Sequence, residues 1–77
     1  MNFDAFIQSE GEVIVLFYAE WYAPSMNQKR SLESTISSNR LLCIDVDIFI
    51  ELTDRFKIKA VPTLIKFLEG EVTFRSI

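Results

Sequence analysis

The chain has 77 residues, of which 49% are hydrophobic and 25% charged, and its formal net charge is −3 at pH 7. This length predicts one domain over residues 1–77, and the composition excludes a disordered or low-complexity chain. The eight basic residues are scattered and form no phosphate-binding cluster, which excludes nucleic acid as a partner.

The targeting signals expected of exported or membrane proteins are missing from these residues. The first ten contain no basic region followed by an apolar one, so they do not resemble a secretory signal peptide. The longest apolar runs, VIVLFYA and LLCI, are too short to span a bilayer. We therefore expect a cytoplasmic protein that does not engage membranes.

The chain has one cysteine, Cys43, and no histidine. A single cysteine cannot form an intrachain disulfide, and without histidine there is no Ser-His or Cys-His nucleophile. Asp45 and Asp47 alternate along one predicted strand, but two carboxylates are too few for a metal site. We expect no metal and no cofactor.

The first two elements follow from hydrophobic periodicity. Asn2 predicts the cap of a short helix, because its side chain can accept from the free N–H groups of the first turn. Phe3, Phe6 and Ile7 fall on one face of that helix. The run Val13–Ala19 is apolar and rich in β-branched and aromatic residues, which is typical of a strand buried on both faces.

The middle of the chain predicts a second helix, a strand and a third helix. The second helix is expected from Pro24 to about Ser38, because the missing N–H of proline is no loss in a first turn. A buried strand is expected over Leu41–Asp47 and a short helix over Ile48–Phe56. We expect Asp47 to cap this last helix.

The C-terminal part predicts a hairpin. Strands over Thr63–Leu68 and Glu71–Ser76 flank a Glu69-Gly70 turn. The first two strands are joined through a helix and should be parallel, with a right-handed crossover. The order helix-strand-helix-strand-helix-strand-strand predicts an α/β fold with a four-stranded mixed sheet and helices packed on it.

Three stretches of this sequence resemble thioredoxins. VLFYAEW is similar to the approach to the family's active site, YAPS stands where the family has Cys-Gly-Pro-Cys, and VDIFIELTDRFKIKAVPTLIKFLEGEV resembles the stretch through the active-site proline to the hairpin. The resemblance covers Phe3 to Ile77. It implies a minimal thioredoxin-like fold that lacks the family's first strand and C-terminal helix. The most specific matches are Ala19-Glu20-Trp21, Pro24, Val61-Pro62-Thr63 and Gly70-Glu71-Val72.

The departures from the family concern its redox chemistry. The segment Tyr22-Ala23-Pro24-Ser25 replaces the motif, so the two cysteines correspond to Tyr22 and Ser25. Thiol–disulfide exchange needs a thiolate, which neither a phenol nor an alcohol replaces. The family's buried Asp and Lys, which manage the protons of the motif, align with Leu16 and Cys43. The resemblance therefore implies a vestigial motif without catalytic residues.

Trp21 and Tyr22, beside Val61 and Pro62, are expected to form an aromatic ridge that binds a protein or peptide, because Trp and Tyr are enriched at binding hot spots. The family has a cis proline at the position of Pro62, and the backbone of Val61 would pair with an extended peptide. The alternatives are that Trp21 only packs on its loop and that Pro62 only shapes the next strand. Ser25 is expected to bond backbone groups near the helix start.

The hairpin suggests a second surface. The family's final helix covers one sheet face there, so the alternating residues Ile65, Phe67, Val72 and Phe74 are expected to lose cover. We expect a homodimer or a hetero-complex through this self-association face.

The leading interpretation is a redox-inactive, non-enzymatic thioredoxin-like module for binding or assembly. One alternative is a relative of thiol-disulfide oxidoreductases with weak or partner-assisted activity through Cys43. That activity requires an exposed, acidic thiol, whereas apolar neighbours favour an inert thiol with a raised pKa. The other alternative is a structural subunit of an oligomer.

Overall fold

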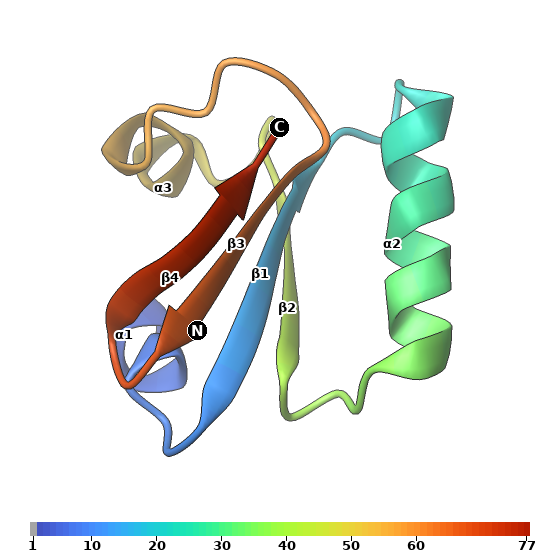
Figure 1. Ribbon diagram of the computed structural model, residues 1–77. Coiled ribbons are helices and arrows are strands. Elements are labelled where there is room, and N and C mark those ends of the chain that lie inside the picture. The colour runs from blue at the N-terminus through green and yellow to red at the C-terminus, as the bar shows by residue number, and fades with distance from the viewer. Residues whose placement is uncertain (1) are drawn as a thin grey trace.

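The computed structural model describes residues 2–77, which form three helices and four strands in the predicted order (Figure 1). The side chain of Asn2 caps the first helix as predicted, because its Oδ1 accepts the Ala5 N–H at 3.0 Å. The hairpin strands have the predicted bounds. The helices are α1 (Phe3–Ile7), α2 (Ala23–Thr35) and α3 (Ile50–Arg55), and the strands are β1 (Glu12–Tyr18), β2 (Leu41–Asp45), β3 (Thr63–Leu68) and β4 (Glu71–Ser76).

Two helices are shorter than predicted. α2 ends at Thr35 because Ile36 is already extended, with φ −115° and ψ 134°. α3 begins only at Ile50, since the N–H groups of Ile48 and Phe49 both bond the Asp45 carbonyl in a preceding turn.

The predicted cap of α3 by Asp47 is wrong. The N-cap residue is Phe49, and it makes no side-chain cap bond. The turn at Asp45 moves the helix start two residues beyond the predicted position, so Asp47 lies outside the first turn and its carboxylate bonds Trp21 instead.

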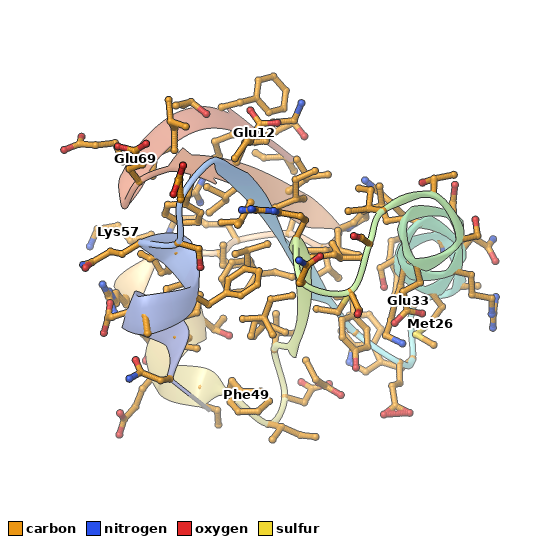
Figure 2. All side chains as sticks on the ribbon, turned by 90° about the horizontal axis from the view of Figure 1, so that it is seen from below. Glu12, Met26, Glu33, Phe49, Lys57 and Glu69 are labelled. Carbon is orange, nitrogen blue, oxygen red and sulfur yellow. The ribbon has the colours of Figure 1, made fainter. Side chains whose placement is uncertain are left out.

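The sheet has the strand order β2-β1-β3-β4. β1 and β2 are parallel, as the helical connection between them predicts, and β3 is antiparallel to both β1 and β4. α1 and α3 lie on one face and α2 on the other, which is clearest when the molecule is seen from below (Figure 2). The predicted α/β fold with a four-stranded mixed sheet is confirmed.

The core lies between the sheet and the face covered by α1 and α3. Phe56 is its aromatic centre, with ring centroids 5.5 Å from Phe3, 6.0 Å from Phe17 and 5.8 Å from Phe67. Such tilted and edge-on pairs add to the stabilisation from burial alone. The buried members of this cluster come from α1 and from three strands: Phe3, Ile7, Val13, Val15, Phe17, Ile44, Ile65 and Phe67.

The predicted self-association face is wrong for Ile65 and Phe67. They are 0% and 1% exposed, because they point from β3 into the core beneath α1 and α3. Val72 and Phe74 are exposed, at 53% and 48%, but they do not share a face. A bulge beside Phe67 sets Val72 opposite Phe67 and Phe74 opposite Lys66, so the alternation along β4 is interrupted.

Candidate functional site

The four residues of the vestigial motif form the loop end and first turn of α2. Tyr22 is the N-cap residue and Pro24 lies in the first turn, as expected for a residue without an N–H. Pro24 and Ala23 are exposed, whereas Ser25 is fully buried. The motif thus presents Tyr22 to the surface and turns Ser25 inward.

Ser25 is engaged entirely with backbone. Its Oγ accepts the Ala19 N–H at 3.1 Å and lies 2.8 Å from the Ala19 carbonyl and 2.9 Å from the Tyr22 carbonyl, to either of which the hydroxyl donates. These bonds join the start of α2 to the end of β1. The expectation that Ser25 bonds backbone groups is confirmed, and the chain has no histidine to activate it.

Trp21 and Tyr22 form the exposed aromatic part of the site. Trp21 is 72% exposed and Tyr22 41%, and their ring centroids lie 6.0 Å apart at an interplanar angle of 54°. The indole N–H of Trp21 donates to Asp47 Oδ2 at 2.8 Å. This bond orients the indole from a loop 26 residues further along the chain. Sequence reasoning missed Asp47 as this partner, since its position suggested a helix cap.

The structure brings Trp21 and Val61 together around a shallow hollow of about 180 Å³. The Val61-Pro62 peptide bond is cis. Within residues 2–77, the backbone of Val61 makes no hydrogen bond to another backbone group. The other lining residues were not predicted from the sequence, because they come from the end of β2 and from the segment around α3: Val46, Thr53, Ile58, Lys59 and Ala60.

Leu16 and Cys43 are directly paired across β1 and β2. Leu16 is fully buried, and Cys43 is partly buried on the face covered by α2. Burial raises the pKa of the Cys43 thiol, and the nearby Glu33 carboxylate raises it further, while Lys29 opposes both effects. A raised pKa lowers the fraction of reactive thiolate at neutral pH.

The described part of the chain offers little other chemistry. Among residues 2–77, no group of three or more His, Cys, Asp or Glu side chains is placed to bind a metal ion. The same residues include no helix of the length and apolar character needed to cross a membrane.

Comparison with known proteins identifies the family. The thioredoxin family model matches residues 1–76. The chain is 33% identical over 78 residues to mouse protein disulfide-isomerase A5, covering 91% of this chain and 15% of that protein. It is 37% identical over 62 residues to thioredoxin-1 of Drosophila melanogaster, covering 74% of this chain and 58% of that protein.

Solved structures agree with this assignment. A mutant thioredoxin of Halobacterium salinarum superposes with a TM-score of 0.84 at 26% identity, over 96% of this chain and 67% of that one. The chain therefore spans about three fifths or less of the two curated relatives and two thirds of this thioredoxin structure. The matched residues, the shared topology and the structural agreement together show that the chain belongs to the thioredoxin family, without the family's pair of motif cysteines.

Proposed function

We propose that the chain is a redox-inactive thioredoxin-like module that binds a protein or peptide through the surface formed by Trp21, Tyr22, Val61 and Pro62, here called the aromatic ridge. The observation that carries the proposal is the burial and hydrogen bonding of Ser25. Its hydroxyl is fully buried and bonded to backbone groups at the position of the second motif cysteine. A residue used in this way supports the loop, and its oxygen is out of reach of a substrate.

The ridge has the physical character of a contact surface. Trp21 and Tyr22 offer large apolar area with few rotatable bonds, and such residues dominate binding energy when a partner desolvates them. Asp47 holds the indole in place, which reduces the entropy lost on binding. The unpaired backbone of Val61 beside the indole offers hydrogen bonds to an extended peptide.

The redox part of the proposal is tested by reduction of insulin in the presence of dithiothreitol. We expect the wild type to reduce insulin no faster than dithiothreitol alone, because it has no pair of thiols. The Tyr22→Cys/Ser25→Cys variant is the matched positive control. A wild-type rate above dithiothreitol that disappears in Cys43→Ser would instead support an oxidoreductase working through Cys43.

The binding part is tested by affinity capture followed by measurement of the dissociation constant for each captured protein. A Trp21→Ala/Tyr22→Ala variant should bind at least about 30-fold more weakly, the equivalent of about 2 kcal/mol at a hot spot. Phe74→Asp, which changes an exposed residue of the hairpin, should bind as the wild type does. The reverse pattern would move the interface from the aromatic ridge to the hairpin.

A further inference from the structure

The hollow of about 180 Å³ beside Trp21 is lined by one charged side chain among residues 2–77, that of Lys59. Lys59 is exposed, and its ammonium group makes no ion pair and no hydrogen bond within the same residues. Lys29, in contrast, is paired with Glu33 at 3.2 Å. The hollow therefore combines apolar walls with a positive charge that a ligand can neutralise.

The other side-chain donors that line the hollow are already used. The indole N–H of Trp21 donates to Asp47, and the Thr53 hydroxyl donates to the Phe49 carbonyl at 2.9 Å. The remaining lining side chains are apolar: Val46, Ile58, Ala60 and Val61. A ligand in the hollow thus meets apolar side chains, the unpaired backbone of Val61 and one ammonium group.

The hollow is formed by the inner part of the chain. Its lining residues lie between positions 21 and 61, where the loop from β1 to α2 meets the segment from α3 to β3. Both segments lie at the same end of the sheet, at the top of the view in Figure 1. The shape of the hollow therefore follows from packing among these residues and does not involve either end of the chain.

The size of the hollow suits one side chain of an extended peptide. An engineered apolar cavity of about 150 Å³ holds a benzene ring, so this hollow has room for one aliphatic or aromatic side chain. A peptide strand paired with the backbone of Val61 directs alternate side chains to the same face. Two residues of such a strand span about 7 Å. The peptide residues within two positions of the one in the hollow are therefore within reach of the Lys59 side chain.

The ammonium group of Lys59 determines which of these neighbouring residues is favoured. It has three donors and no acceptor, and a carboxylate gives it the stronger, charge-assisted hydrogen bond. Proteins recognise the phosphate groups of peptides with clusters of arginine, whereas one lysine matches a carboxylate. The carboxylate of Asp47 beside the indole N–H would repel a second carboxylate there, which restricts an acidic residue to the Lys59 side.

We propose that Lys59 sets the specificity of the aromatic ridge. The peptide that binds there has an aspartate or glutamate within two residues of an apolar residue, whose side chain fills the hollow while the carboxylate pairs with the Lys59 ammonium. This inference rests on the proposed binding function of the ridge and names the class of its ligand. Apolar contact supplies most of the affinity, and the ion pair decides among apolar peptides.

Selection from a phage-displayed library of random heptapeptides tests the preference. We expect the wild type to enrich peptides with Asp or Glu within two residues of an aliphatic or aromatic residue, and Trp21→Ala/Tyr22→Ala to enrich none of them. Peptides that depend on the ridge but show no preference for Asp or Glu would overturn this inference and leave ridge binding intact. No enrichment, or equal enrichment by both proteins, would overturn both proposals.

Titration of one selected peptide measures the effect of its charge, with the fluorescence of the single tryptophan as the signal. Replacing its Asp or Glu by Asn or Gln should weaken binding about fivefold, the equivalent of about 1 kcal/mol for an exposed ion pair. The difference should disappear in about 1 M salt, where the Debye length is about 3 Å. An amide analogue that binds as tightly as the acidic peptide would contradict the inference.

Charge reversal on the protein locates the effect. Lys59→Glu should weaken binding of the acidic peptide at least about tenfold, because like charges then face each other, and should favour an analogue with lysine instead. Lys57→Glu is the matched control, since it makes the same change of charge at an exposed residue that does not line the hollow. It should bind within about twofold of the wild type, because salt screens charges outside the contact. Circular dichroism checks that both variants fold. Equal losses in both would assign the preference to overall charge and overturn the role of Lys59.

Discussion

The hydroxyl of Ser25 bonds both backbone groups of Ala19, accepting the N–H at 3.1 Å and lying 2.8 Å from the carbonyl. The two residues are the buried ends of the loop that contains Trp21 and Tyr22. A side chain at the position of a family cysteine therefore closes the loop that presents the aromatic ridge. Ser25, which replaces the second motif cysteine, therefore stabilises the conformation of the aromatic ridge.

Replacing this hydroxyl should cost stability. We expect Ser25→Ala to lower the free energy of unfolding by about 1–3 kcal/mol, because it leaves the buried N–H of Ala19 without a partner, whereas the Ala19 carbonyl still accepts the Tyr22 N–H. Urea denaturation followed by circular dichroism measures the change. Ser34→Ala is the matched control, since its hydroxyl bonds a carbonyl on the exposed side of the same helix. It should change stability by less than about 0.5 kcal/mol. Equal losses in both variants would show that the burial of Ser25 has no special effect.

The aromatic centre of the core should be sensitive to truncation. We expect Phe56→Ala to lower the free energy of unfolding by about 2–4 kcal/mol, because the ring contacts three other phenylalanines from α1, β1 and β3. Phe74→Ala, at an exposed position of the hairpin, should cost less than about 1 kcal/mol. The same denaturation experiment compares them, and a Phe74→Ala loss as large as that of Phe56→Ala would be inconsistent with the core described here.

The bond between Trp21 and Asp47 should limit motion of the indole. Since the chain has one tryptophan, its fluorescence reports this residue alone. We expect Asp47→Ala to lower the time-resolved anisotropy of Trp21 through faster local motion, with a stability change below about 1 kcal/mol because the bond is exposed. Asp47→Asn keeps an acceptor and should retain the wild-type anisotropy. If both variants behave alike, the bond does not orient the indole.

The thiol of Cys43 should make stability depend on alkaline pH. Its pKa is raised in the folded state by burial and then by Glu33, so the folded protein holds the proton more tightly than the unfolded chain. The contribution is fully present below the unfolded pKa of about 8.5 and is lost as pH rises through the folded-state pKa.

The experiment compares the wild type with Cys43→Ser by urea denaturation from pH 7 upward. We expect the wild type to lose more stability than the variant above about pH 8.5. Alkylation of Cys43 by iodoacetamide should half-saturate at a higher pH than alkylation of glutathione. Parallel stability curves for the two proteins would contradict the prediction.

Two other groups add a loss of stability at still higher pH, and they do so in both proteins. Burial raises the pKa of Tyr18. Burial is the largest single effect and lowers the pKa of Lys29, but the hydrogen bond to Glu33 and the negative charges of Glu33, Tyr18 and Cys43 together raise the pKa overall. Because both shifts are upward, their contributions disappear as pH rises, and Cys43→Ser retains most of each, since the Cys43 charge is the weakest of their causes.

Much of the fold followed from local patterns. The continuous apolar run at β1 and the Gly-containing turn between β3 and β4 predicted their elements within about one residue, because burial on both faces and turn geometry leave few alternatives. The ends of α2 and α3 did not follow in this way. Ile36 and Asp47 have side chains that suit a helix, but a turn held by the Asp45 carbonyl and the extended backbone at Ile36 decided otherwise.

Some features of the candidate site could likewise be predicted from the sequence, and one could not. The loss of both motif cysteines could be seen in the residues, as could the backbone role of Ser25, because residue type limits chemistry before any folding is known. The pairing of Trp21 with Asp47 joins residues 26 positions apart and depends on where β2 ends, so no local pattern contains it.

Residue identity and short-range spacing were enough to establish the family, the order of the elements and the lack of a thiol pair. Long-range packing was needed to establish which face each hairpin residue occupies. Alternation along β3 and β4 would have placed Ile65 and Phe67 with Val72 and Phe74. The packing of α1 and α3 buries the first pair, while Val72, opposite Phe67 on the outermost strand, stays exposed. The bulge sets Phe74 on the other face, opposite Lys66, because the side of a sheet on which a residue lies is set by the strand's register with its neighbours.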